Sequence, residues 1–186
     1  MGDFVKGPIP ADLPDELSRH LRLHRRLDSY TQQSRAFQRS RRRLDPRFRY
    51  ARSILVDVFY DHFLARHWRQ YSSRPLTAFA QDVYRGLQSN YALLPAALQQ
   101  QLPHMIEHDW LTSYQHTDVV SKVLRRLEMR LQHKFPLAQG IAELERCQAS
   151  LENDFAAFML EVTDVIGHRY EHAQVDQAGA AEKNFE

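Results

Sequence analysis

Apolar positions recur at helical spacing along most of the chain, and this pattern predicts an all-α protein. Helix-favouring residues such as Leu, Arg, Gln, Ala and Glu are abundant, whereas glycine occurs only 6 times. With prolines and caps as boundaries, we expect helices over about 14–33, 34–43, 45–71, 76–92, 94–110, 116–135 and 137–172, the fifth broken or kinked at Pro103. The sequence therefore predicts a single compact multi-helix domain over residues 1–173 and a frayed tail over 174–186.

The segment SILVDVFYDHFLARHW, residues 53–68, places acidic and imidazole side chains on an otherwise apolar helix. At about 100° per residue, Asp57 and Asp61 fall beside Ile54 on an apolar face, and His62 is expected to be buried with them. An isolated ionised carboxylate in the interior costs several kcal/mol, so each must be protonated, paired with Arg or His, or bound to a cation.

The first long helix repeats this anomaly with His20, His24 and Asp28 on its apolar face. A histidine four residues before an aspartate brings both side chains to one point, as a metal site requires. Carboxylate and imidazole ligands suit Mn²⁺, Mg²⁺ or Fe²⁺ better than a structural Zn²⁺ site. Two alternatives stay open: His24 is a core histidine and Asp57 pairs with an arginine, or the whole set is a structural polar network.

The charge is distributed unevenly along the chain. Residues 1–74 hold 16 Lys and Arg against 8 Asp and Glu, a balance of +8, whereas residues 75–186 hold 9 against 15, a balance of −6. The densest basic stretch is residues 35–52, which forms either a solvated, partly paired surface or a binding surface for an acidic protein, a phosphate-bearing ligand or nucleic acid. No apolar run is long enough to span a membrane and no signal peptide is visible, so we expect no membrane partner and a cytoplasmic location.

Five blocks of the sequence resemble the acyl carrier protein phosphodiesterases, in this order and at these spacings. They are GDFVKG at 2–7, LHRRLD at 23–28, LVDVFYDHFLARHW at 55–68, WLTSY at 110–114 and LENDFAAFM at 151–159. The resemblance implies an HD-domain-like helical enzyme of fatty acid metabolism. Such an enzyme uses a divalent ion, Mn²⁺ in the first place with Mg²⁺ or Fe²⁺ as alternatives, to hydrolyse the phosphodiester between 4′-phosphopantetheine and a serine of acyl carrier protein.

Position by position, the resemblance marks seven site residues: Asp3, His24, Asp28, Asp57, Asp61, His62 and His67. We assign the metal-binding role to Asp3, His24, Asp28, Asp61 and His62. We assign catalytic roles to Asp57, His67 and Arg25, and expect Arg26, Arg41, Arg42 and Arg43 to meet the acidic carrier protein. His20 lies outside the shared motifs and is expected in the core or behind the ligands.

The implied reaction is hydrolysis by a water that the ion activates, with Arg25 or Arg26 neutralising the phosphoryl oxygens and His67 or His62 protonating the serine leaving group. Family members carry a further segment with histidines ahead of the GDF block, whereas Met1 directly precedes Gly2 here. Two other functions are compatible with the residues: an HD-type nucleotide phosphohydrolase, and a non-enzymatic arginine-rich helical module that binds RNA or protein. No nucleic-acid partner is expected, because the chain lacks the glycine pattern of a known RNA-binding module.

Overall fold

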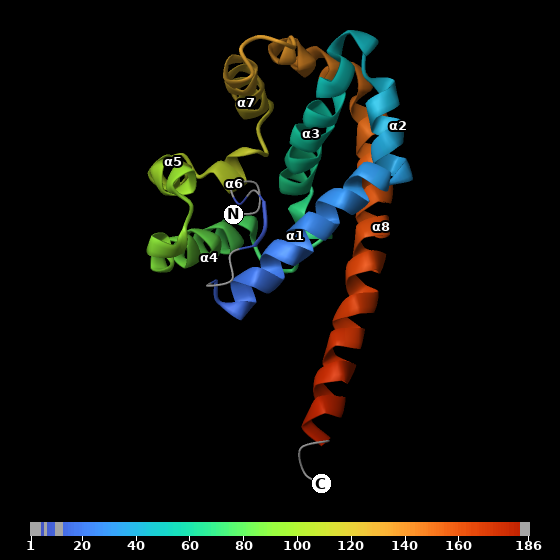
Figure 1. Cartoon of the computed structure of the whole chain (residues 1–186). Helices are drawn as coiled ribbons and strands as arrows, with labels where there is room; N and C mark the ends of the chain where they lie inside the picture. Colours follow the sequence, from blue (N-terminus) through green and yellow to red (C-terminus); the bar gives the residue numbers. More distant parts are fainter. Residues whose placement is uncertain (1–4, 6, 10–12, 183–186) are drawn as a thin grey trace.

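The part of the chain that the computed structural model describes contains eight α-helices (Figure 1). The structure describes residues 5, 7–9 and 13–182, and side chains up to residue 163. The helices are α1 (Asp15–Gln33), α2 (Arg35–Arg43), α3 (Arg52–Arg66), α4 (Leu76–Ser89), α5 (Ala96–Glu107), α6 (Trp110–Ser113), α7 (Thr117–Arg130) and α8 (Gly140–Glu182). Short 3₁₀ turns lie at η2 (Pro46–Ala51), η3 (Trp68–Gln70), η4 (Tyr91–Leu93) and η5 (Leu137–Gln139). No strand occurs in these described ranges, which confirms the all-α prediction.

The main core surrounds α3, which packs against α2, α7 and α8. Its interior is apolar and aromatic, with the largest fully buried side chains at Phe37, Phe48, Phe59 and Phe63. Burying one such side chain stabilises the fold by about 1.5–3 kcal/mol. The start of α8 comes very close to this core, because a Cβ atom at Gly140 would collide with the buried side chain of Leu55.

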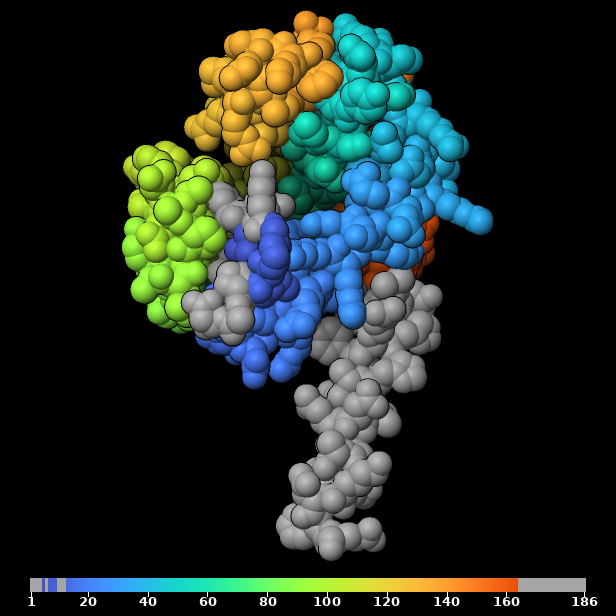
Figure 2. Space-filling model, viewed as in Figure 1, coloured from blue at the N-terminus to red at the C-terminus, as the bar shows by residue number. Residues whose placement is uncertain are grey.

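A second, smaller apolar cluster lies under α4 and α5, centred on Leu94, Leu98 and Leu102. Figure 1 shows α4, α5 and α6 grouped on one side of the molecule and α2, α3 and α8 on the other. In the space-filling view, α1 lies across the face between the two groups (Figure 2). Tyr84 of α4 stabilises the connection between α5 and α6. Its hydroxyl donates to Asp109 Oδ1 at 3.1 Å and accepts from Leu111 N at 2.9 Å.

Helix boundaries differ from the predicted ones next to residues with a positive φ, the left-handed backbone conformation. The residues after Pro46 form the 3₁₀ turn η2, and Arg49 has a positive φ of 50°, so α3 starts only at residue 52. Helix α5 continues through Pro103 and ends where Asp109 adopts a φ of 41°. Similarly, positive φ values at Gln132 and His133 follow α7.

The two ends of the long last helix also differ from expectation. Helix α8 begins at Gly140 and reaches Glu182, beyond the predicted end near residue 172. In Figure 1 it projects past the other helices. Residues 183–186 lie outside the described part, and the frayed tail stays a prediction. Within the described residues, no helix has the length and apolar character needed to cross a membrane.

Candidate functional site

His62 is held in a fixed orientation between two of the sequence blocks. Its side chain is 1% exposed, as predicted, and its Nδ1 lies 2.7 Å from the carbonyl oxygen of Tyr114, the last residue of the WLTSY block. A carbonyl oxygen can only accept, so Nδ1 carries the hydrogen and donates it. Burial lowers the pKa of His62 and outweighs the hydrogen bond to Tyr114, which raises it. The imidazole is therefore neutral, with a lone pair on Nε2.

The two aspartates of α3 are exposed, which corrects the prediction that they lie inside the protein. Asp57 and Asp61 occupy one edge of the helix, next to the partly buried Ile54, while the core covers the rest of the circumference. Apolar neighbours on a helical wheel do not show which sector is covered, and carboxylates favour the solvated one. The charge of Asp61 still reaches Tyr114, since burial first and then this charge raise the pKa of the tyrosine to about 12.

Helix α1 carries a histidine and aspartate pair of its own. His24 Nδ1 lies 3.6 Å from Asp28 Oδ1, four residues along the helix as the spacing predicts. The His24 side chain is 32% exposed and that of Asp28 is 60% exposed, so the pair lies at the surface and not within the core. His20 is exposed as well, which contradicts a place in the core, whereas its alternative place behind the ligands stays a prediction. Histidine and aspartate remain well solvated at such an edge of a helix.

Arg25 connects the LHRRLD block to the GDFVKG block. Its Nη2 donates to the carbonyl oxygens of Val5 at 3.0 Å and Gly7 at 2.7 Å. These bonds hold Val5 and Gly7 against α1, a role that the sequence did not indicate. Arg26 is exposed, as expected. Asp3, a predicted metal ligand, lies outside the described residues.

His67 pairs with Glu152 of the LENDFAAFM block, which the sequence did not single out. His67 Nε2 lies 3.4 Å from Glu152 Oε1, and both side chains are 29% exposed. The same oxygen lies 3.6 Å from Arg66 Nη1 and accepts a hydrogen bond from Gln148 at 3.3 Å. The two partners are 85 positions apart, so helical spacing could not pair them. The only signal in the sequence was that both lie in blocks that resemble the same family.

Of the predicted carrier-binding arginines, Arg43 has a structural role. Its Nε donates to Asp154 Oδ2 at 2.7 Å, and Arg39 Nε donates to Oδ1 of the same carboxylate at 2.9 Å. Burial alone would raise the pKa of Asp154, but the hydrogen bonds from Arg43 and Arg39 outweigh it and hold that pKa below its usual value. Replacing Arg43 would therefore disturb the fold. Arg42 is exposed, and Arg41 is partly buried beside Gln38.

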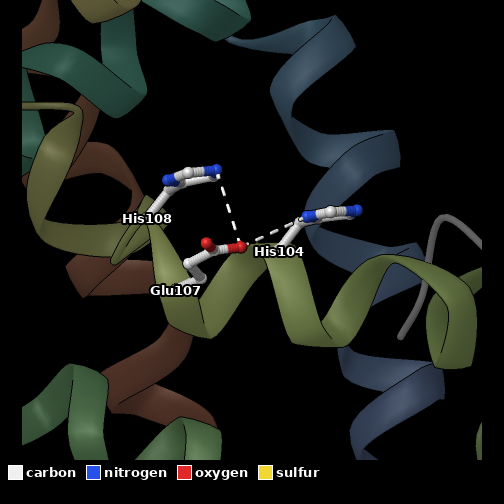
Figure 3. Close-up of side chains that lie close together, drawn as sticks. All are labelled: His104, Glu107 and His108. Atoms are coloured by element: carbon white, nitrogen blue, oxygen red, sulfur yellow. Dashed lines mark ion pairs between the residues drawn. The ribbon is translucent and has the colours of Figure 1, made fainter.

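The structure also contains a group of possible metal ligands that the sequence analysis missed. His104, Glu107 and His108 lie at the C-terminal end of α5 with their ligand atoms within 4.8 Å of one another (Figure 3). Within the described part of the chain, no other three His, Cys, Asp or Glu side chains come this close, so the predicted ligands of α1 and α3 do not form such a group among themselves. The H-x-x-E-H spacing at 104–108 was the available signal.

Comparisons with known proteins agree with the resemblance in the five blocks. The family model for acyl carrier protein phosphodiesterase matches residues 1–162. The acyl carrier protein phosphodiesterase of Pectobacterium atrosepticum is 31% identical over 147 residues, 78% of this chain and 76% of the relative. Those of Klebsiella pneumoniae and Yersinia pestis are each 28% identical over 159 residues, 85% of this chain and 82% of the relative. No solved structure gives a significant match. The chain belongs to the acyl carrier protein phosphodiesterase family.

Proposed function

We propose that this chain is a metal-dependent phosphodiesterase that hydrolyses the bond between 4′-phosphopantetheine and a serine of acyl carrier protein, releasing the apo form of the carrier. Family membership over residues 1–162 supports the reaction class and the substrate. The single observation that carries the site is His62, a buried neutral imidazole whose Nδ1 donates to a backbone carbonyl.

This arrangement fits a metal ligand. Histidines that bind metal ions commonly donate the second ring nitrogen to a carbonyl or carboxylate, which fixes the tautomer and orients the lone pair of the other nitrogen. Tyr114 provides that carbonyl for His62. The WLTSY block therefore acts in the site through its backbone, and its contribution is to orient the imidazole.

The other proposed ligands are mainly carboxylates. We propose that Asp28 and His24 on α1 and Asp61 on α3 join His62 at one ion, together with Asp3 as the family resemblance implies. No three of the described members of this set lie within ligand distance of one another, so an ion would have to draw them together. A donor set rich in oxygen with some imidazole favours Mn²⁺, with Mg²⁺ or Fe²⁺ as alternatives. When bound, such an ion lowers the pKa of a water molecule and neutralises charge on a phosphoryl oxygen.

The exposure of these aspartates suits a substrate that is itself a protein. Asp57 and Asp61 on α3 and Asp28 on α1 are all exposed, so a phosphodiester on the surface of another protein can approach them. We propose that Asp57 orients the attacking water by accepting its hydrogen. The partial exposure of the set also explains why the apo protein tolerates it, since solvated carboxylates avoid the cost of burial.

His67 is proposed as the acid that protonates the serine oxygen of the carrier as it departs. Glu152 accepts from its imidazole and keeps the ring oriented, and Arg66 and Gln148 in turn hold the carboxylate of Glu152. Arg25 is bonded to two carbonyl oxygens of the N-terminal segment, so we propose that it acts by placing this segment next to α1.

The basic side of the chain is proposed to attract the acidic carrier protein. Exposed Arg26 and Arg42 and the partly buried Arg41 are available for this purpose, whereas Arg43 is committed to Asp154. Long-range attraction of this kind raises the association rate and weakens with salt. Replacing Arg26 and Arg42 by Glu, with Arg43 left intact, should weaken carrier capture and flatten its salt dependence. The cytoplasmic location stays a prediction.

Intact-mass measurement of holo acyl carrier protein tests the proposed function. Incubation with the chain and Mn²⁺ should remove the phosphopantetheine mass from the carrier, and a chelator should prevent it. A nucleotide with a phosphodiester serves as the control substrate and should stay intact. If the holo carrier keeps its mass with Mn²⁺, Mg²⁺ and Fe²⁺ alike, the proposal is wrong.

A further inference from the structure

A group of two imidazoles and one carboxylate lies exposed at the end of α5, a helix that contributes none of the residues proposed for phosphodiester hydrolysis. Glu107 Oε2 lies 3.5 Å from His104 Nδ1 and 3.9 Å from His108 Nε2. Figure 3 shows the two imidazoles on either side of the carboxylate. The rings are nearly parallel, with an angle of 6° between their planes.

We propose that His104, Glu107 and His108 form a second metal site, on the protein surface, for a borderline transition-metal ion, Zn²⁺ in the first place. Ligand atoms around a tetrahedral Zn²⁺ are separated by roughly 3.3 Å, given metal to ligand distances of about 2.0–2.1 Å. The two measured separations are already close to this value. The two imidazole nitrogens lie within 4.8 Å of each other, so the parallel rings would have to rotate to direct both lone pairs at one ion, and water would fill the fourth position.

The donor types distinguish this site from the oxygen-rich one on α1 and α3. Two imidazoles with one carboxylate favour Zn²⁺, Ni²⁺ or Cu²⁺ over Mn²⁺ or Mg²⁺. The side chains are 69%, 67% and 56% exposed for His104, Glu107 and His108, so an ion reaches them without any opening of the fold. The same exposure leaves the side chains mobile before binding, and ordering them reduces the affinity.

The site spans the point where α5 ends. His104 and Glu107 belong to the helix, His108 is its C-cap residue, and the left-handed Asp109 follows directly. An ion bound to the three ligands would link the C-cap residue His108 to His104 and Glu107 in the last helical turn. It therefore stabilises the corner that leads into α6, next to the hydrogen bonds that Tyr84 makes with Asp109 and Leu111.

Calorimetric titration of Zn²⁺ into the full chain carrying Asp61→Asn tests this site apart from the proposed catalytic ion. We expect one equivalent of Zn²⁺ to bind, and His104→Ala or His108→Ala in the same background to weaken it by about tenfold or more, because each removes one of three ligands. His116→Ala is the matched control, an exposed histidine before α7, and should leave the affinity unchanged.

Residue-specific imidazole signals in nuclear magnetic resonance spectra provide a second readout. Zn²⁺ should shift the His104 and His108 signals together and leave that of His116 in place. The proposal is overturned if the double variant His104→Ala/His108→Ala binds Zn²⁺ as its parent does, if no equivalent binds, or if the two signals do not move. Loss of carrier hydrolysis would bear only on the other site, so the two proposals fail independently.

Discussion

The two sides of this molecule present histidine in opposite ways. On the α3 side, His62 is 1% exposed and its Nδ1 is bonded to the Tyr114 carbonyl, within the larger core. On the α5 side, His104 and His108 are exposed above the smaller cluster of Leu94, Leu98 and Leu102. The hydrogen bond to Tyr114 fixes the tautomer and direction of the first imidazole, and burial keeps it neutral, before any ligand arrives. The exposed imidazoles must be ordered by the ion, at a cost of up to about 1.5–2 kcal/mol per side chain.

We propose that the two sides have different tasks because of this difference. Catalysis needs groups that are held in place in advance, because loose positioning by even about 1 Å costs rate. The α3 side meets that need for His62, while its exposed aspartates leave access for a protein substrate. The α5 side meets only the weaker requirement of binding an ion. The following substitutions test whether the division holds.

The largest effect is expected for Asp61→Asn, which removes the charge of a proposed metal ligand with little change in shape. Phosphodiester hydrolysis of the holo carrier should fall by about a hundredfold or more, since charge stabilisation at the phosphoryl group depends on the ion. The thermal midpoint without metal should hardly change, because the side chain is exposed. His104→Ala is the control from the α5 side and should retain full activity. Equal activity of Asp61→Asn and the unmutated chain would contradict the assignment.

The second largest effect is expected for the free energy of unfolding, which should fall much more for a variant of His62 than for a variant of His104. His62→Ala removes a buried ring that contacts Phe63 and leaves the Tyr114 carbonyl without this donor. It should lower the free energy of unfolding by about 2–4 kcal/mol. His104→Ala should change it by no more than about 0.5 kcal/mol, because the side chain is exposed. Urea unfolding of both variants measures the contrast, and similar values for the two would show that His62 is not packed as described.

Two helical glycines test the packing of the same two sides. Gly140→Ala, beside Leu55, should destabilise the protein by about 1–3 kcal/mol, because the new methyl group collides with a buried side chain. Gly86→Ala in α4 meets nothing within 4 Å and should stabilise by up to about 1 kcal/mol through helix propensity. Urea unfolding should give opposite signs. A destabilised Gly86→Ala variant would contradict the open space beside Gly86 that the structure shows.

A further modest effect concerns acid stability at the Asp154 carboxylate. Its pKa is lowered on folding, so its contribution to stability is complete above the ordinary carboxyl range and is lost as the pH falls through the lowered value. Because Arg39 and Arg43 are partly solvated, Asp154→Asn should cost about 1–2 kcal/mol at pH 7. The difference from the unmutated chain should shrink below about pH 4. A difference that is constant from pH 7 to pH 3 would argue against the ion pairs as its cause.

The sequence was sufficient for the helices and for the burial of His62, because helical periodicity and apolar content are local properties. It was not sufficient for the exposure of Asp57 and Asp61, since the covered sector of α3 depends on how distant helices pack. The helix predicted over about 94–110 ends at Glu107, because the left-handed Asp109 follows its C-cap, and no local pattern marks that residue.

Side-chain pairs between residues far apart in the sequence could not be predicted from helical periodicity either. Glu152 meets His67 only because the start of α8 returns to α3. The sequence predicted that Arg43 would contact the carrier protein, but its guanidinium forms an ion pair with Asp154, 111 positions away. Such pairs follow from the tertiary arrangement, whereas the pair of His24 and Asp28 follows from helix spacing alone.

We propose that His62 presents an unprotonated Nε2 to the catalytic ion. Nitrogen-15 chemical shifts of the His62 imidazole test it most directly, measured on the full chain before and after addition of Mn²⁺, with His116 as the reference signal. We predict the neutral tautomer with hydrogen on Nδ1 before addition, and broadening of the His62 signal by the paramagnetic ion at concentrations that leave His116 sharp. A His62 ring with hydrogen on Nε2, or a signal that stays sharp while Mn²⁺ supports hydrolysis of the holo carrier, would contradict the claim.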